Sequence, residues 1–301
     1  MARGHAHRAV TPPHPLRDPD PGDAMLTKVR RWFSADPREE LKLALGDTPI
    51  PAFRGVVMEI LKLLRDPVAD HRKIGNAVAQ DPGLSIRVLK LVNSPAYGLK
   101  RKVDNVPHAA ALLGRNDLEE IVLALAVREA LPQHAIADSS FWRIAARRAA
   151  TARAIAQRID PSQASLSFSG GLLQDLAVPM LASAKPDYLE IWQEAPGTRQ
   201  LPELERQRYG WTHADVASWM CEAWSFPKPL RDAIEGHHTT ADTAQIPVAV
   251  QVAALLEHHE DDPEALIEEG RDRFNLDPDL LELALHEGKE GGDRLAIAMA
   301  R

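Results

Sequence analysis

The sequence predicts an all-α protein. Along most of the chain the apolar residues recur at spacings of three and four, which places them on one face of an α-helix. Several helix starts are marked by a capping residue followed by proline, as at Asp81-Pro82 and Ser94-Pro95. No stretch alternates apolar and polar residues for long enough to indicate a β-sheet. We therefore expect a fold of packed helices.

The composition excludes several classes of protein. The 301 residues are 45% apolar and 26% charged, which is typical of a globular protein with a sizeable core. Cys221 is the single cysteine, so the chain cannot form an internal disulfide and suits a reducing compartment. No apolar run approaches the roughly 20 residues that cross a bilayer, and the N-terminus lacks the apolar stretch of a secretion signal. A cytoplasmic location is the simplest expectation.

The charge argues against nucleic acid as a partner. The formal net charge is -7, whereas binding to a duplex draws much of its strength from clustered lysine and arginine. Basic residues between Arg87 and Lys102 are a local exception, but charges this close in sequence usually form a solvated face. We expect no nucleic-acid partner. A nucleic-acid-binding regulator that uses this segment is a weaker alternative, which strong salt dependence of binding would favour.

The first half of the chain is predicted to form a helical bundle. Residues 1–24, rich in proline and poor in apolar periodicity, are expected to be a disordered lead. Residues 25–45 are expected to hold an amphipathic helix. Residues 46–135 then carry dense helical periodicity, with Gly114 as the boundary between the last two helices. The helices expected in this lobe cover about 50–65, 71–80, 82–92, 106–113 and 118–131.

The second half is also predicted to be helical. Residues 136–240 begin with a long helix, rich in alanine and arginine, over about 141–157. Residues 241–301 are expected to add C-terminal helices. The shorter helices expected after the long one cover about 188–194, 201–209, 213–224, 229–236 and 247–258, with two or three more after residue 263.

A series of motifs resembles the HDOD domain family. The longest is the string from Gln80 to Gly98, QDPGLSIRVLKLVNSPAYG. The others follow in the family's order: Ala110–Gly114, Phe141-Trp142, Gly171–Asp175 and His237-His238. The resemblance covers roughly Gly46 to Thr240. It implies an N-terminal helical lobe packed on a lobe related to the HD metal phosphohydrolases, and a bacterial signalling or regulatory role without an established general reaction.

The ligand set of an HD phosphohydrolase is incomplete here. Such an enzyme uses several histidines and an adjacent His-Asp pair, because a bound water must be acidified while the phosphate charge is neutralised. This chain has Gln174-Asp175 at the position of that pair, and Ile144 where an earlier histidine often stands. An amide binds transition metals poorly and an alkyl group does not bind them. Asp175, His213 and His237 remain as vestigial metal candidates.

The adjacent histidines are not expected to share one ion. Neighbouring side chains on an α-helix point about 100° apart, so His237-His238 would diverge. We therefore expect no catalytic metal and no cofactor, and expect Asp175 to accept hydrogen bonds from His213 or His237. A cleft that binds a nucleotide or other anion without turnover is the alternative. Its lining would be Gln174, Asp175, His213, His237 and His238.

Two other polar segments are given structural interpretations. The turn that carries Asn93, Ser94 and Tyr97 is expected to cap helices, with polar tips available for contact between the lobes or with a partner. The acidic stretch around His258-His259 is expected to be a solvated helix end.

The sequence thus predicts a non-enzymatic signalling module that acts on protein partners through a degenerate HD site. A residual metal-dependent phosphohydrolase or a nucleotide-binding sensor, using Asp175, His213 and His237, is the alternative. The Gly-Tyr-Pro triplet of cyclic-dinucleotide hydrolases is absent from the sequence.

Overall fold

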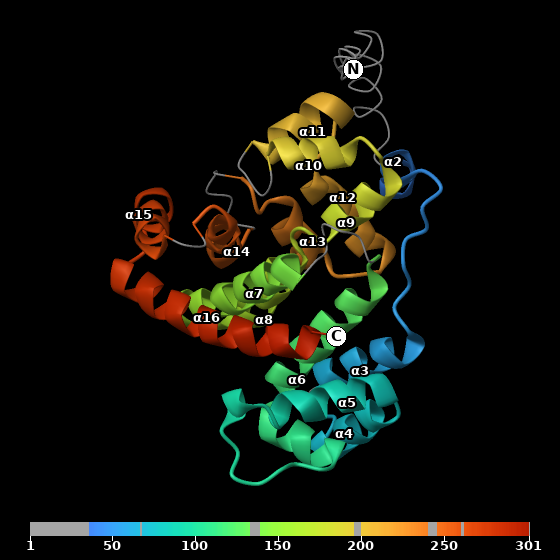
Figure 1. Ribbon diagram of the computed structural model, residues 1–301, viewed down its shortest axis with the longest axis vertical. Coiled ribbons are helices and arrows are strands. Elements are labelled where there is room, and N and C mark those ends of the chain that lie inside the picture. Colours follow the sequence, from blue (N-terminus) through green and yellow to red (C-terminus); the bar gives the residue numbers. More distant parts are fainter. Residues whose placement is uncertain are drawn as a thin grey trace, which may run out of the picture. The chain divides into compact units, whose positions relative to one another are not determined.

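A computed structural model of the chain describes residues 36–66, 68–132, 139–195, 200–239, 246–259 and 262–300. Every regular element in these ranges is an α-helix or a 3-10 helix and none of their residues forms a strand, which confirms the predicted all-α class (Figure 1). The predicted disordered lead and the start of the predicted amphipathic helix lie outside the described residues. No described helix is long and apolar enough to span a membrane.

The helices of the first half begin at polar caps. The side chains of Asp70, Asp81 and Asn105 each accept a hydrogen bond from a backbone N–H in the first turn of the helix that follows. In α6 the backbone leaves helical geometry at Gly114, with φ 76° and ψ 175°, which confirms the predicted boundary between two helical stretches. The elements are α2 (Pro37–Leu45), α3 (Gly55–Arg65), α4 (His71–Ala79), α5 (Pro82–Val92), η1 (Pro95–Tyr97) and α6 (Val106–Ala130).

The helix predicted from residue 50 begins later, at Gly55. The preceding segment is held against the end of α12 (His213–Ala223) instead. The ring of Phe53 lies 4.7 Å from that of Trp224, and Trp224 Nε1 donates a hydrogen bond of 2.8 Å to the carbonyl oxygen of Pro51. Phe53, which continues the apolar period of the helix in the sequence, therefore packs against Trp224 instead.

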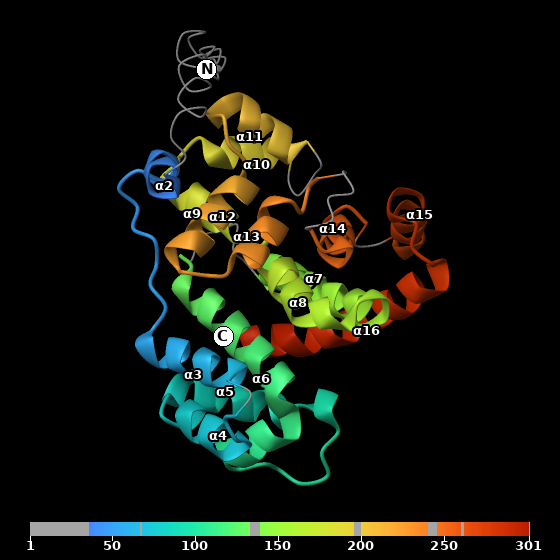
Figure 2. The ribbon, with the colours of Figure 1, turned by 180° about the vertical axis from the view of Figure 1, so that it is seen from behind.

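In the second half, the long helix α7 (Ser139–Ile159) contacts α8, α14 and α16 (Figures 1 and 2). Most helices of this half agree with the expected ranges. The remaining elements are η2 (Pro161–Gln163), α8 (Ala164–Leu173), α9 (Ala177–Ala184), α10 (Tyr188–Glu194), α11 (Leu201–Tyr209), α12 (His213–Ala223), α13 (Lys228–Glu235), α14 (Val248–Ala254), η3 (Leu255–Glu257), α15 (Pro263–Phe274) and α16 (Pro278–Met299).

Helices α8 and α9 were not predicted. Every residue of α8 from Ser167 to Leu173 is buried, so the segment has no polar face and shows no helical periodicity. Its two adjacent glycines allow this burial. A Cβ at Gly171 would lie 2.8 Å from the backbone oxygen of Arg148 in α7, and a Cβ at Gly170 would lie 2.9 Å from Val250 in α14.

One hydrophobic core joins both halves of the chain. It extends from Leu41 in α2 through α3–α9 to Met299 in α16. The boundary between two lobes at residues 135 and 136 therefore stays a prediction.

Helix α16 approaches α7 closely because glycines line the contact. A Cβ at Gly288 would lie 2.7 Å from the Cα of Thr151, and a Cβ at Gly292 would lie 2.6 Å from the Cα of Arg147. Both glycines are buried. The closeness of the two helices therefore depends on residues that have no side chain.

We expect Gly292→Ala to destabilise the protein by about 1 to 3 kcal/mol, because the new methyl group would meet backbone atoms that cannot rotate away. Urea unfolding followed by circular dichroism would measure the change. Gly55→Ala is the matched control, since its Cβ meets nothing within 4 Å. If both variants unfold at the same urea concentration, the close α7–α16 contact is not required for stability.

Candidate functional site

Four side chains converge in a buried cluster. Asp175 follows α8, His213 is the first residue of α12, and His237 and His238 follow α13. Each offers one ligand atom, and these atoms all lie within 4.8 Å of one another. Asp175, His213 and His237 are each at least nine-tenths buried. The structure therefore brings together all three vestigial candidates and adds His238.

The expectation that His237 and His238 diverge is wrong. Helix α13 ends at Glu235, and the two histidines lie in the turn beyond Gly236. Because the angle of a continuous helix does not apply there, their ring centroids are only 3.9 Å apart. His238 Nε2 lies 3.0 Å from His213 Nε2.

Asp175 Oδ1 faces two of the rings. It lies 3.3 Å from His213 Nε2 and 3.4 Å from His237 Nε2, at the long limit of the hydrogen bonds that were expected there. His237 Nε2 is buried and makes no hydrogen bond to a described residue. The ring is held from its other side, where Nδ1 lies 2.6 Å from the carbonyl oxygen of Ile234.

Arg148 is a residue of the cluster that the sequence did not point to. Its buried guanidinium, from the middle of α7, pairs with Asp175 through Nη1 and with Glu257 through Nη2. Ile144, which was assigned to the position of a lost histidine, lines a different, largely apolar cavity. The signal in the sequence was its position: Arg148 lies on the apolar face of α7, where Ala145, Ala149 and Ala152 are all buried. A charged residue on such a face is unusual unless it is paired.

Glu257 corrects the expectation for the acidic stretch near residue 258. Its carboxylate points into the cluster rather than into solvent, and its side chain is 20% exposed. His259 is also part-buried and lies 3.0 Å from Glu269 Oε2. Glu257 and His259 are therefore not solvated, whereas Asp262 is exposed as expected and residues 260–261 lie outside the described residues.

Glu205 supports His213 from behind and was also missed. It is fully buried, and its Oε2 lies 2.8 Å from His213 Nδ1 while accepting a hydrogen bond of 2.9 Å from the backbone N–H of His213. Its other oxygen accepts a hydrogen bond of 2.5 Å from the hydroxyl of Tyr188. This arrangement makes Nδ1 of His213 the donor and turns Nε2 toward Asp175 and His238.

The charges of the cluster are strongly perturbed. Burial opposes ionisation of Asp175, but the positive charge of Arg148 and the contacts with His213 and His237 outweigh it, so its pKa lies well below the usual range. Burial also opposes the charging of His213, yet Glu205 and Asp175 raise its pKa to about 10. Burial, with repulsion from His237 and His213, holds the pKa of His238 well below its usual value. Asp175 is thus an anion and His238 is neutral.

Gln174 does not join the cluster. Its side chain is buried, and neither the amide nitrogen nor the amide oxygen has a hydrogen-bond partner among the described residues. Gln174 is also not among the residues that line the small cavity beside the cluster.

The predicted turn at Asn93 lies apart from the cluster. Asn93 Nδ2 donates to the carbonyl oxygens of Leu89 and Val103, and Asn93 Oδ1 accepts from the N–H of Val103, each at 2.8 Å. The Ser94 hydroxyl is buried without a partner in the described part of the chain. Tyr97 lines a separate cavity formed with α6, α7 and α16.

The cavity beside the cluster is very small. It measures about 10 Å³ and is lined by Asp175, Val178, Trp192, Leu201, His213, His238 and Glu257. This is close to the minimum volume that holds one water molecule. A nucleotide does not fit the space that these residues enclose.

The side chains of the cluster are of the types that bind one transition-metal ion in a closed coordination site. Three imidazoles and a carboxylate are a typical ligand set for zinc, and tetrahedral bonds of 2.0–2.1 Å place neighbouring ligand atoms about 3.4 Å apart. The Asp175 contacts of 3.3 and 3.4 Å match that spacing, whereas the Nε2 atoms of His213 and His238 are closer, at 3.0 Å. His237 Nε2 has no hydrogen bond to a described residue. Arg148, however, already neutralises the carboxylate, and the cavity has no room for an open coordination position together with a substrate.

Comparison with known proteins agrees with the fold. The HDOD domain family model matches residues 50–240. Similar solved structures include a candidate phosphohydrolase from Shewanella amazonensis SB2B, with 19% identity, a TM-score of 0.69, and coverage of 87% of this chain and 99% of that chain. A candidate signal transduction protein from Marinobacter aquaeolei VT8 has 19% identity and a TM-score of 0.68, over 93% of this chain and 66% of that chain.

Two further relatives have no stated function. An HDOD domain protein of unknown function from Geobacter sulfurreducens has 20% identity and a TM-score of 0.63, over 86% of this chain and 99% of that chain. An uncharacterised protein of Treponema pallidum is 24% identical over 192 residues, or 63% of this chain. The match spans only 37% of that protein's length.

The described part of the chain is all-helical and shares its fold with the similar solved structures. The family match covers well over half of the chain. This protein belongs to the HDOD domain family, as its sequence motifs predicted.

Proposed function

We propose that this protein is a non-enzymatic signalling module that acts through contacts with protein partners. The observation that carries the proposal is the buried pairing of Arg148 with Asp175 and Glu257 next to a cavity of about 10 Å³. A hydrolase needs an open site for a water and a phosphate ester. Here an internal cation neutralises the carboxylate, and the space holds about one water.

The similar solved structures support a regulatory role only by analogy. One of them is a candidate signal transduction protein, and the likeness in fold does not by itself carry function. The physical support lies in the closed cluster. A site that cannot admit substrate still stabilises the fold and still presents an outer surface to a partner.

A residual phosphohydrolase is the second candidate, and the four converging ligand atoms favour it. Asp175, His213, His237 and His238 would hold the ion. When bound, it would polarise a phosphoryl oxygen and lower the pKa of a bound water. His213 would first have to release the proton that Glu205 and Asp175 favour.

We expect no hydrolysis of bis(p-nitrophenyl) phosphate by the purified protein in the presence of Mn²⁺, Fe²⁺ or Zn²⁺. Elemental analysis would be run on the same preparation, with Asp175→Ala and His213→Ala as comparison variants. Bound metal without turnover agrees with a closed structural site. Turnover that disappears in both variants would overturn the proposal in favour of the enzyme.

A further inference from the structure

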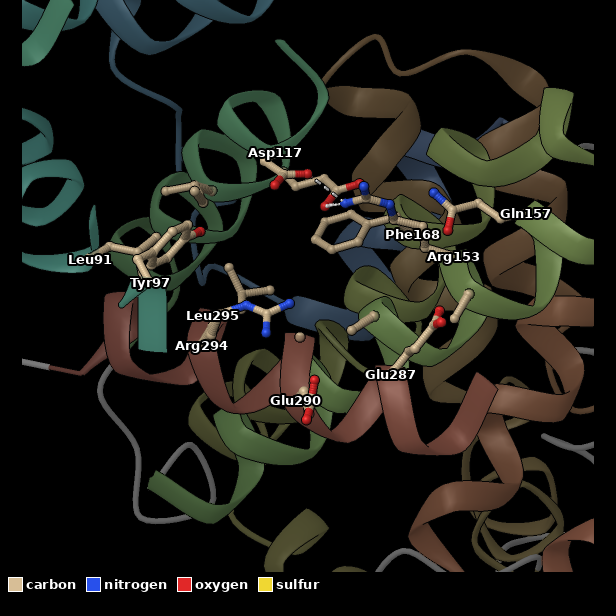
Figure 3. A pocket seen from close by; sticks show the side chains of 15 residues that line it. Leu91, Tyr97, Asp117, Arg153, Gln157, Phe168, Glu287, Glu290, Arg294 and Leu295 are labelled. Carbon is tan, nitrogen blue, oxygen red and sulfur yellow. Dashed lines mark hydrogen bonds and ion pairs between the residues drawn. The ribbon is translucent and has the colours of Figure 1, made fainter. Parts of the chain in front are cut away.

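A second cavity, of about 230 Å³, lies between α16 and helices α5–α8 (Figure 3). Its lining includes no residue of the histidine cluster, and helix α16 begins at Pro278, beyond the residues that match the family. Its apolar wall is formed by Leu91, Ile121, Phe168 and Leu295.

The acidic groups on the α6 side are largely neutralised. Arg153 Nη1 lies 2.9 Å from Asp117 Oδ1 and 2.5 Å from Glu120 Oε2. Burial raises the pKa of Glu120 to about 8 against the opposing charge of Arg153, and Asp117 adds to the rise. Glu120 is therefore mostly protonated at neutral pH, and Asp117 balances the charge of Arg153.

The acidic groups of α16 also have partners. Glu287 accepts hydrogen bonds from both terminal nitrogens of Arg158, at 3.0 and 2.7 Å. Glu290 Oε1 lies 3.5 Å from His286 Nε2. Glu287 is thus neutralised by Arg158, whereas the contact of Glu290 is an ion pair only when His286 is protonated.

Arg294 is the second arginine that lines the cavity. It stands four residues after Glu290 on α16, a spacing at which the two side chains can pair favourably. No described residue forms an ion pair or a hydrogen bond with it. Figure 3 shows its guanidinium turned into the cavity, on the side where Tyr97 lies.

We propose that this cavity binds a small organic monocarboxylate, with the carboxylate on Arg294 and an apolar body against Phe168 and Leu295. The planar guanidinium fork matches a carboxylate in a bidentate way. Arg294 makes no ion pair with a described residue and can therefore pair with one carboxylate, while the nearby Asp117 and Glu290 disfavour a phosphate dianion. The volume is below the 300–1,000 Å³ of pockets for drug-sized ligands, which excludes a nucleotide.

This inference goes beyond the proposed function and does not depend on whether the histidine cluster holds a metal. The ligand would contact α16 through Arg294 and Leu295, and the family domain through Phe168 of α8. Its binding would therefore stabilise the attachment of the C-terminal helix to that domain.

The test is a ligand-observed NMR titration of the full chain with phenylacetate and hexanoate, each compared with its neutral amide. We expect the carboxylates to bind saturably and the amides to bind about tenfold more weakly, because the amide loses a charge-assisted contact. Arg294→Gln should weaken carboxylate binding by about tenfold or more. Arg271→Gln removes the same charge from an arginine that does not line the cavity and should leave the affinity unchanged.

Several results would overturn the proposal. These are the absence of saturable binding by both acids, equal affinity for acid and amide, or an Arg294→Gln variant that folds normally and binds as well as the unmodified protein. A third probe, phenyl phosphate, addresses the choice of anion. Tighter binding of phenyl phosphate than of phenylacetate would also count against the monocarboxylate assignment.

Discussion

Replacing Arg148 by alanine is expected to destabilise the folded protein by about 3 to 5 kcal/mol. The guanidinium is buried and pairs with two carboxylates, Asp175 and Glu257. Its removal would leave the anionic Asp175 in the interior without its main partner, and burial of an unpaired charge is costly. Urea unfolding at pH 7 would measure the loss.

The matched control is Arg158→Ala. Arg158 also makes a paired contact, with Glu287, but at the surface, where such a pair contributes about 0 to 1 kcal/mol. The double variant Arg148→Ala with Asp175→Asn should recover part of the loss, because the buried negative charge is removed as well. Equal destabilisation by Arg148→Ala and Arg158→Ala would show that Arg148 is not the internal cation of the cluster.

Raising the pH from 5 to 8 is expected to destabilise the protein through Glu120. Its pKa is about 8 in the folded chain, against an ordinary value of 4.5, chiefly because of burial. Between these values the unfolded carboxyl has lost its proton while the folded one keeps it. The folded state therefore binds more protons, so the stability from this group is present below about pH 4.5 and is lost progressively toward pH 8.

The slope from this one group is at most about 1.4 kcal/mol per pH unit. Glu120→Gln should remove that contribution and make the variant more stable than the unmodified protein at pH 8, as measured by urea unfolding at several pH values. Glu203→Gln, at an exposed position of α11, is the control. If Glu120→Gln leaves the pH profile unchanged, Glu120 keeps an ordinary pKa and its carboxylate is charged in the cavity.

The helical fold was largely predictable because its signals are local. Periodicity and caps are properties of short segments, so helices such as α4 and α5 were placed within a residue or two of their observed ends. Helix α8 failed this test because its residues from Ser167 to Leu173 are all buried. This segment contacts α7, α13 and α14. It therefore has no polar face, and its sequence shows no alternation of apolar and polar residues with the helical period.

The candidate site was predictable only in part. The motif order pointed to Asp175, His213 and His237, and the structure brings them together. The role of His238 depended on where α13 ends, and sequence reasoning is least reliable at helix ends. Glu205 and Glu257 lie far along the chain from Asp175, so no local pattern linked them to it.

The sequence by itself determined the helical class, the family and the residue types available for chemistry, because these follow from local periodicity and from motifs. Only the tertiary structure decided that Arg148 occupies the interior beside Asp175, that His237 and His238 converge, and that the remaining space holds about one water. These outcomes depend on which distant side chains the packing of helices places in contact. The electrostatics of the site follow from those contacts and from burial, neither of which is a property of a segment alone.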